Sequence, residues 1–147
     1  MRTALLDVNA LIALLWEEHP FHESCMAWFA GAAAAGWATC PITESGCVRL
    51  LSTPAFTANP PSVASALRIL QIATESGGSH RFWSDDLPLS ALRVRWSKGM
   101  GHKQITDAYL LALAVQRHGC LVTFDTRLEA LAAEGKIDRD ALLILRP

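Results

Sequence analysis

The sequence carries no excess of charge of either sign. Its 13 Lys and Arg residues nearly balance its 14 Asp and Glu residues, and the formal net charge is -1 at pH 7. Affinity for a polyphosphate depends on cations that neutralise it, so this balance excludes a broadly basic nucleic-acid coat protein. Any contact with RNA must therefore be local.

The sequence also lacks the cysteine spacing of a zinc finger or of a redox pair. Its four cysteines form no C-x-x-C pair, so we expect free thiols that pack as small hydrophobes in a reducing compartment. His19, His22 and Cys25 resemble a ligand cluster only superficially, because they sit at a helix break, and we assign no site to them. The cysteines are Cys25, Cys40, Cys47 and Cys120.

No long hydrophobic run is present either. Asp7 and Asn9 interrupt the apolar opening at 1–16, which argues against a secretory signal. The longest stretch of low polarity, 26–38, falls short of the roughly 20 residues that cross a bilayer. We therefore expect a cytoplasmic protein that makes no contact with a membrane.

The chain has instead the composition of a globular protein. Of its 147 residues, 51% are hydrophobic and 18% are charged, which suits one compact domain with a substantial core. Neither an internal repeat nor a linker interrupts the sequence. We therefore expect a single domain over residues 1–147.

Short apolar segments alternate with helical ones. Strands are expected at 4–6, 37–40, 121–124 and 142–145, with an edge strand at 80–83. Between them, helical patterns follow Asp7 and recur at 21–35, from Thr43 to Pro54, from Ser62 to Gly77, at 89–96, 107–118 and 126–134. This alternation predicts an α/β fold, a three-layer α/β/α domain with a mainly parallel central sheet of four to five short strands.

Four acidic residues occupy equivalent places in this alternation. Asp7 and Asp125 each follow a strand, whereas Glu44 and Asp107 each open a helix. In a parallel sheet both kinds of position lie at the carboxyl edge, so we expect the four acids to converge on one rim. Taken singly, each acid is better explained as a helix cap or a charge near a helix dipole. The set of four reverses that preference.

Grouped carboxylates repel one another and raise each other's pKa values. Divalent cations between them would remove this cost. Oxygen ligands without neighbouring Cys or His favour Mg²⁺ or Mn²⁺ over zinc. Because such ions commonly act on phosphates, the four acids predict phosphate chemistry.

The segments that carry these acids resemble the successive motifs of PIN domains. The resemblance spans nearly the whole chain and is closest to the VapC toxins of toxin–antitoxin pairs, in which the segment before the third acid often reads like 101–107 here. The matching segments are 6–11 (LDVNAL), 43–44 (TE), 105–110 (ITDAYL) and 123–125 (TFD).

This resemblance implies a fold, an activity and a site. It implies a PIN-like domain that is a Mg²⁺- or Mn²⁺-dependent endoribonuclease, with an RNA substrate, a VapB-type antitoxin and a homodimeric state. It makes Asp7, Glu44, Asp107 and Asp125 the catalytic, metal-binding acids, and whether Asp125 binds directly or through water stays open. Asn9 and Thr106 would help to orient the acids.

The implied reaction is hydrolysis by water. One or two Mg²⁺ ions would activate a water that attacks an RNA phosphodiester, leaving a 5′-phosphate. His102 beside the site would be accessory at most, since a metal can activate water without a base. For the antitoxin, the first helical hairpin would supply the anchors Leu15, Trp16 and Phe29.

Basic residues around a glycine-containing loop could guide the RNA backbone to the metals, although each could equally belong to an ordinary solvated charged face. The candidate RNA contacts are Arg93, Arg95, Lys98 and Lys103, with Arg49 and Arg127 as further candidates.

Two other functions are open to the sequence. A haloacid-dehalogenase-like phosphohydrolase also places an acid after its first strand, but it needs an aspartate two residues later, where this chain has Asn9. A non-catalytic PIN-like module for RNA binding or as an adaptor would not need the complete set of four acids.

Overall fold

The computed structural model describes residues 1–92 and 101–146 of the chain. Within them, one sheet contains strands paired in parallel in the order β3-β2-β1-β4-β5. β1 is the central strand. The chain first adds β2 and β3 on one side of it and later β4 and β5 on the other, so the strand order reverses between β1 and β4. The strands are β1 (Ala4–Leu6), β2 (Trp37–Thr39), β3 (His80–Phe82), β4 (Cys120–Thr123) and β5 (Leu142–Ile144).

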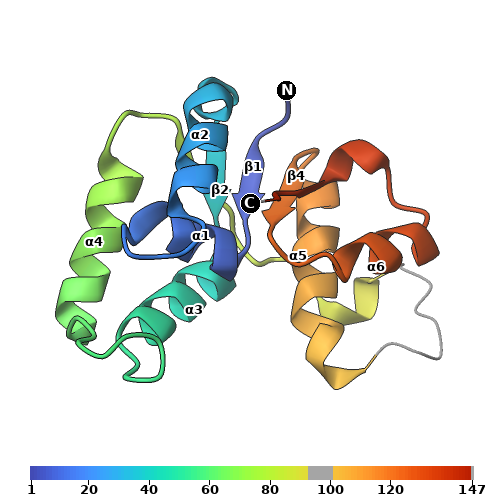
Figure 1. Ribbon diagram of the computed structural model, residues 1–147. Coiled ribbons are helices and arrows are strands. Elements are labelled where there is room, and N and C mark those ends of the chain that lie inside the picture. Colours follow the sequence, from blue (N-terminus) through green and yellow to red (C-terminus); the bar gives the residue numbers. More distant parts are fainter. Residues whose placement is uncertain (93–100, 147) are drawn as a thin grey trace.

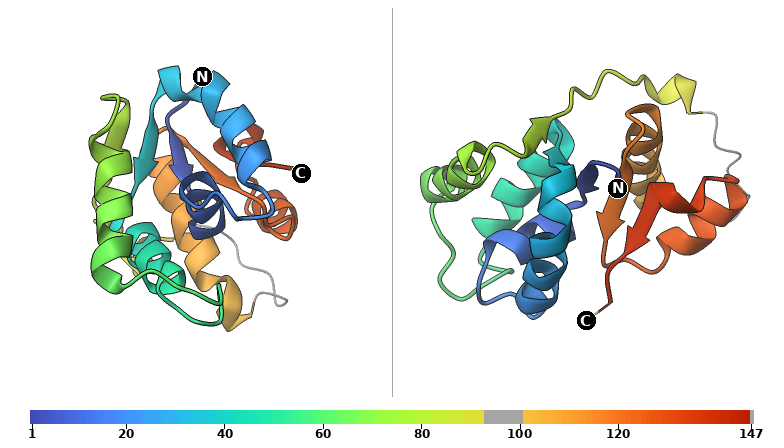
Figure 2. Two further views of the ribbon diagram at one scale, coloured as in Figure 1. Left: turned by 60° about the vertical axis from the view of Figure 1, so that its left-hand side comes forward. Right: turned by 90° about the horizontal axis from the view of Figure 1, so that it is seen from above.

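Helices cover both faces of this sheet, and the expected three-layer α/β/α arrangement with a parallel sheet is confirmed. Figure 1 shows α1–α4 on one side of the strands and α5 and α6 on the other, and the turned views of Figure 2 agree. None of the helices in the described part of the chain is long and apolar enough to cross a membrane. The helices are α1 (Val8–Leu15), α2 (His22–Ala32), α3 (Pro41–Leu51), α4 (Val63–Glu75), α5 (Ile105–Gln116) and α6 (Leu128–Glu134).

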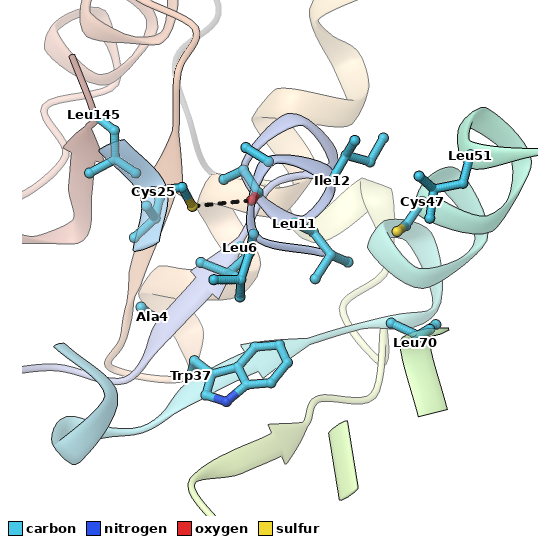
Figure 3. Packing of buried hydrophobic residues seen from close by; sticks show 14 of the residues in the cluster. Ala4, Leu6, Leu11, Ile12, Cys25, Trp37, Cys47, Leu51, Leu70 and Leu145 are labelled. Carbon is cyan, nitrogen blue, oxygen red and sulfur yellow. Dashed lines mark hydrogen bonds between the residues drawn. The ribbon is translucent and has the colours of Figure 1, made fainter. Parts of the chain in front are cut away.

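The central strand divides the core into two halves. Ala4 and Leu6 of β1 point into the cluster beneath α1–α4, whereas Leu5 points into the cluster beneath α5 and α6. Successive side chains of a strand alternate between faces, so a strand covered on both sides must be apolar throughout. Figure 3 shows Leu6 of the first cluster packed beside Leu11 and Trp37.

The cysteines are free thiols, as expected. The Cys25 thiol donates to the Ala10 carbonyl oxygen at 3.4 Å, the dashed contact of Figure 3. Burial raises the pKa of Cys25 to about 11 and that of Cys47 to about 12. These two thiols therefore stay protonated at neutral pH and pack as apolar groups.

Two helices begin earlier than the sequence suggested. Thr43 does not open α3, as the helical pattern from Thr43 predicted, because Pro41 starts the helix and Cys40 is its N-cap. The Thr43 hydroxyl accepts from the Cys40 N–H at 3.0 Å. Proline favours the first helical position, since its fixed φ suits a helix and its missing N–H has no partner there anyway. Thr106 likewise lies inside α5, because a 3-10 turn at His102–Gln104 runs directly into that helix.

Other bounds differ by one to three residues. The expected helix at 21–35 ends at Ala32 and continues as a 3-10 turn at Ala33–Ala35, and α6 starts at Leu128. Residues 89–91 form a 3-10 turn. The backbone of Leu92 is extended, so the expected helix does not continue there, and residues 93–96 lie outside the described residues.

Helix α3 approaches α1 closely at Gly46. A Cβ atom at this position would lie 2.7 Å from Cγ2 of Val8. Val8 directly follows Asp7, and Glu44 precedes Gly46 by two residues. This contact therefore fixes how two of the candidate acids approach one another.

We predict that Gly46→Ala destabilises the protein by about 1–3 kcal/mol, because the added methyl group overpacks against a stiff, β-branched side chain. The measurement is denaturant unfolding. Gly31→Ala is the matched control, since a Cβ at that position of α2 would meet no atom within 4 Å apart from its own local helix backbone. This control should gain about 0.5–1 kcal/mol through the better helix propensity of alanine. Equal stabilities of the two variants would contradict the close approach.

Candidate metal centre

Asp7 occupies the carboxyl end of the central strand, beside the point where the strand order reverses. Its side chain is 7% exposed, and its two oxygens are already held. Oδ1 accepts from the Val8 N–H at 2.6 Å and Oδ2 from the Thr123 hydroxyl at 2.8 Å. Burial raises the pKa of Asp7, these hydrogen bonds oppose the rise, and the charge of Asp125 adds to it.

Thr123 connects three candidate residues at this edge. It is the last residue of β4, its side chain is fully buried, and its hydroxyl donates to Asp7. The same oxygen accepts from the Asp125 N–H at 3.1 Å. The side-chain oxygen of Asn9 accepts from the Phe124 N–H at 3.2 Å, which ties the start of α1 to the end of β4. The sequence motif contained Thr123, but we expected no role for it.

Asp107 lies in the first turn of α5 and is half-buried. The pKa of Asp107 is raised to about 6, mainly by burial and also by the charges of Asp7 and Asp125, whereas the charge of Arg127 acts to lower it. Asp7, Asp107 and Asp125 therefore share one electrostatic field. The structure thus places these three expected site residues near enough for their charges to interact.

Asp125 already has a cationic partner. Arg127 donates from Nη2 to Oδ2 at 2.6 Å and from Nε to Oδ1 at 2.9 Å. This guanidinium holds the pKa of Asp125 below its ordinary value. Asp125 thus differs from Asp7 and Asp107, whose pKa values are raised.

Glu44 is anchored by a different part of the sheet. It lies in the first turn of α3, where its Oε1 accepts from the Thr39 hydroxyl at 2.6 Å. The Thr39 oxygen lies 2.8 Å from Nε2 of His80. The charge of Glu44 raises the pKa of His80 against a larger lowering by burial. The sequence drew no attention to Thr39 or His80, since no local motif contains them.

With the side chains as they stand, no group of three or more His, Cys, Asp or Glu residues in the described ranges 1–92 and 101–146 could hold a metal ion. The four acids therefore do not close around one point in these side-chain conformations. Their donor chemistry nevertheless fits a hard divalent cation, because it consists of carboxylate oxygens. Burial is the largest cause of the raised pKa values of Asp7 and Asp107, and neighbouring carboxylates add to it; a bound cation would favour the ionised form of both.

The remaining candidates lie around this edge. The Thr106 side chain is exposed, and within the described residues its hydroxyl makes no hydrogen bond to an acid. Lys103 and His102 are exposed in the 3-10 turn before α5. Arg49 lines a groove of about 690 Å³ between α3 and α4 that reaches Glu44. The candidate RNA contacts outside the described residues are Arg93, Arg95 and Lys98.

Comparison with known proteins gives concordant matches over nearly the whole chain. The PIN domain family model matches residues 4–134. The chain is 44% identical over 131 residues to Ribonuclease VapC38 of Mycobacterium tuberculosis H37Rv. This match covers 89% of this chain and 91% of that protein. Ribonuclease VapC44 of the same strain is 45% identical over 133 residues, covering 90% and 92% respectively.

A third relative extends the match further. Ribonuclease VapC39 of the same strain is 41% identical over 141 residues, or 92% of this chain and 98% of that protein. The resemblance inferred from the motifs is thus confirmed at the level of the family. The chain belongs to the PIN-domain family and, within it, to the VapC group.

Proposed function

We propose that this protein is the toxin of a VapBC-type pair and a metal-dependent endoribonuclease that hydrolyses RNA phosphodiester bonds. The observation that carries the proposal is that Asp7 is buried at the carboxyl end of the central strand and is joined through Thr123 to Asp125. The raised pKa values of Asp7 and Asp107 support it. Relatives named ribonucleases, similar over about nine-tenths of the chain, point to RNA as the substrate class.

Asp7, Glu44, Asp107 and Asp125 would hold Mg²⁺ or Mn²⁺. When bound, the ion supplies a Lewis acid that activates water as the nucleophile and stabilises negative charge on the phosphate. The protein's own residues orient the carboxylates: Thr123 and the Val8 N–H hold Asp7, while Asn9 ties α1 to β4. No side-chain base is required, so His102 stays accessory.

The substrate backbone would be met by a small number of cations near the acids. Arg127 pairs with Asp125, Lys103 is exposed in the 3-10 turn that precedes Asp107, and Arg49 lines the groove that reaches Glu44. Arg93, Arg95 and Lys98, on the segment before Lys103, are proposed as further contacts. Such contacts fix the register of RNA without reading its sequence.

We propose a VapB-type antitoxin and a second copy of the chain as protein partners. The expected antitoxin anchors Leu15, Trp16 and Phe29 are all half-buried. The ring of Phe29 packs against Trp37, with centroids 5.7 Å apart. An antitoxin laid across this hairpin would therefore meet only the outer edges of these side chains.

We expect Asp7→Asn and Asp107→Asn to lower the rate of RNA cleavage by at least roughly 100-fold, because a lost ligand removes several kcal/mol of charge stabilisation. Cleavage is measured on a defined RNA with Mg²⁺ or Mn²⁺, and with EDTA. Asp138→Asn is the control, since Asp138 pairs with Arg2 and belongs to none of the proposed ligands. Undiminished cleavage by folded Asp7→Asn protein would refute the assignment of Asp7, whereas absence of cleavage by the wild type would favour a non-catalytic module.

Because water is the nucleophile, we expect cleavage to survive when the 2′-hydroxyl at the cleaved nucleotide is replaced by hydrogen. The fragments should carry 5′-phosphates, which can be tested by 5′-end sequencing with and without phosphatase. Complete loss of cleavage on this substrate would instead indicate attack by the neighbouring 2′-hydroxyl.

The raised pKa of Asp107 predicts how the metal-free protein responds to pH. The folded state keeps the Asp107 proton up to about pH 6, whereas the unfolded chain loses it near 3.8. This group's contribution to stability is therefore full below the lower value and is lost as pH rises through the higher one. We expect Asp107→Asn to raise the melting temperature in EDTA at about pH 7.5, with little gain at about pH 4.

The control is Asp138, a carboxylate whose pKa is shifted in the opposite direction. Arg2 holds the pKa of Asp138 below its ordinary value, so Asp138→Asn should not stabilise the protein at neutral pH. Added Mn²⁺ should raise the melting temperature of the wild type and narrow its difference from Asp107→Asn. A destabilised Asp107→Asn protein at neutral pH would show that burial and the neighbouring charges do not disfavour this carboxylate.

A further inference from the structure

Glu44 is held at the site by residues that neither the motifs nor the comparisons single out. We propose that Thr39 and His80 are positioning residues: the His80 Nε2–H donates to the Thr39 hydroxyl, which donates its only proton to the Glu44 carboxylate. This inference rests on the proposed function, because it assigns the pair a role in a metal site that includes Glu44.

The direction of the two hydrogen bonds follows from counting protons. The Thr39 oxygen lies 2.6 Å from Oε1 of Glu44 and 2.8 Å from Nε2 of His80. An ionised carboxylate can only accept, so the single hydroxyl proton goes to Glu44. The hydroxyl oxygen must then accept from His80. This fixes the tautomer of the imidazole, with its proton on Nε2.

The backbone holds this pair rigidly. Thr39 ends β2 with a fully buried side chain, and His80 opens the neighbouring strand β3. The parallel register sets His80 opposite Trp37, so His80 and Thr39 are diagonal neighbours on one face of the sheet. The ring of Trp37 packs against the imidazole with centroids 4.6 Å apart. A buried hydroxyl without a partner would be costly, so both hydrogen bonds are strongly favoured.

Capping of α3 does not explain the contact. The first turn of this helix is already capped through Cys40 and Thr43, which leaves Glu44 without a capping role. Thr39 engages only Oε1, and within the described residues Oε2 of Glu44 accepts no hydrogen bond. One oxygen is thus fixed by the sheet, and the other remains for a cation.

A second hydrogen bond from a threonine to an acid occurs on the other side of the central strand. Strands β2 and β4 flank β1, and each ends in a fully buried threonine. Thr39 donates to Glu44 as Thr123 donates to Asp7. Two flanking strands therefore each orient one acid through a neutral hydroxyl. This repetition indicates that the hydroxyls serve the acids rather than the local packing of either strand.

The test is Mn²⁺ binding to the purified full chain, measured by calorimetry. Residues that orient a metal ligand typically contribute about 10–100-fold to metal affinity. We expect Thr39→Val to weaken Mn²⁺ binding by about 10-fold or more, and Thr39→Ser, which keeps the hydroxyl, to bind almost as wild type does. His80→Phe keeps a ring against Trp37 but lacks the N–H, and it should lose part of the affinity.

Thr3→Val is the matched control. Its hydroxyl donates to the Ala35 carbonyl at 3.3 Å at the opposite end of β1, so its Mn²⁺ affinity should equal that of the wild type. A second readout is the ¹⁵N spectrum of the His80 ring. The wild type should show the Nε2–H tautomer, and Thr39→Val should lose the hydrogen-bonded Nε2–H signal. A purely packing role for Thr39 would leave that signal unchanged.

Thr39→Val protein that folds and binds Mn²⁺ as wild type does would overturn the inference. If this variant fails to fold, unchanged affinity in His80→Phe overturns it equally. Absence of Mn²⁺ binding by the wild type, or undiminished binding by Asp7→Asn, would overturn the proposed metal site together with this inference. Loss of binding in Asp7→Asn but not in Thr39→Val would remove only the positioning role.

Discussion

The burial of Asp7 is the constraint on which the rest of this edge depends. Its carboxylate sits at the end of a central strand that is covered on both faces, where charge is poorly solvated. The Val8 N–H and the Thr123 hydroxyl offset part of that cost, but Asp125 and Asp107 bring further negative charge into the same field. The elements around Asp7 stay together because apolar packing outweighs this local repulsion. A cation would remove it.

The architecture could be predicted from the sequence because its signals are local. Short apolar strands and helical periodicity fix the layers, and both strand-following acids lie where they were expected. Helix starts were less predictable, since threonine is a common N-cap residue but Thr43 and Thr106 both lie inside their helices. Pro41 and the 3-10 turn before α5 decided those starts. Membership of the PIN-domain family also argues against the alternative of a haloacid-dehalogenase-like phosphohydrolase.

The sequence proposed the four candidate acids but not the hydrogen bonds that hold them. A sequence pattern places an acid at the sheet edge, yet it does not determine the side-chain torsions that set where its oxygens point. Glu44 illustrates this, because it is tied to Thr39 and His80, which are 41 residues apart in the chain. That separation leaves no local signal. The coupling of Asp7, Asp107 and Asp125 likewise depends on burial, which periodicity only outlines.

The partners of the acids divide them into two kinds. Thr39 and Thr123 are neutral donors, so they orient Glu44 and Asp7 without cancelling their charge. Arg127 orients Asp125 as well, but its guanidinium also neutralises that carboxylate. A cation entering this edge would compete with Arg127 for Asp125, whereas it would meet Asp7 with its charge uncompensated. Contact with a cation would therefore cost Asp125 the most among the acids, because the ion pair with Arg127 would have to weaken.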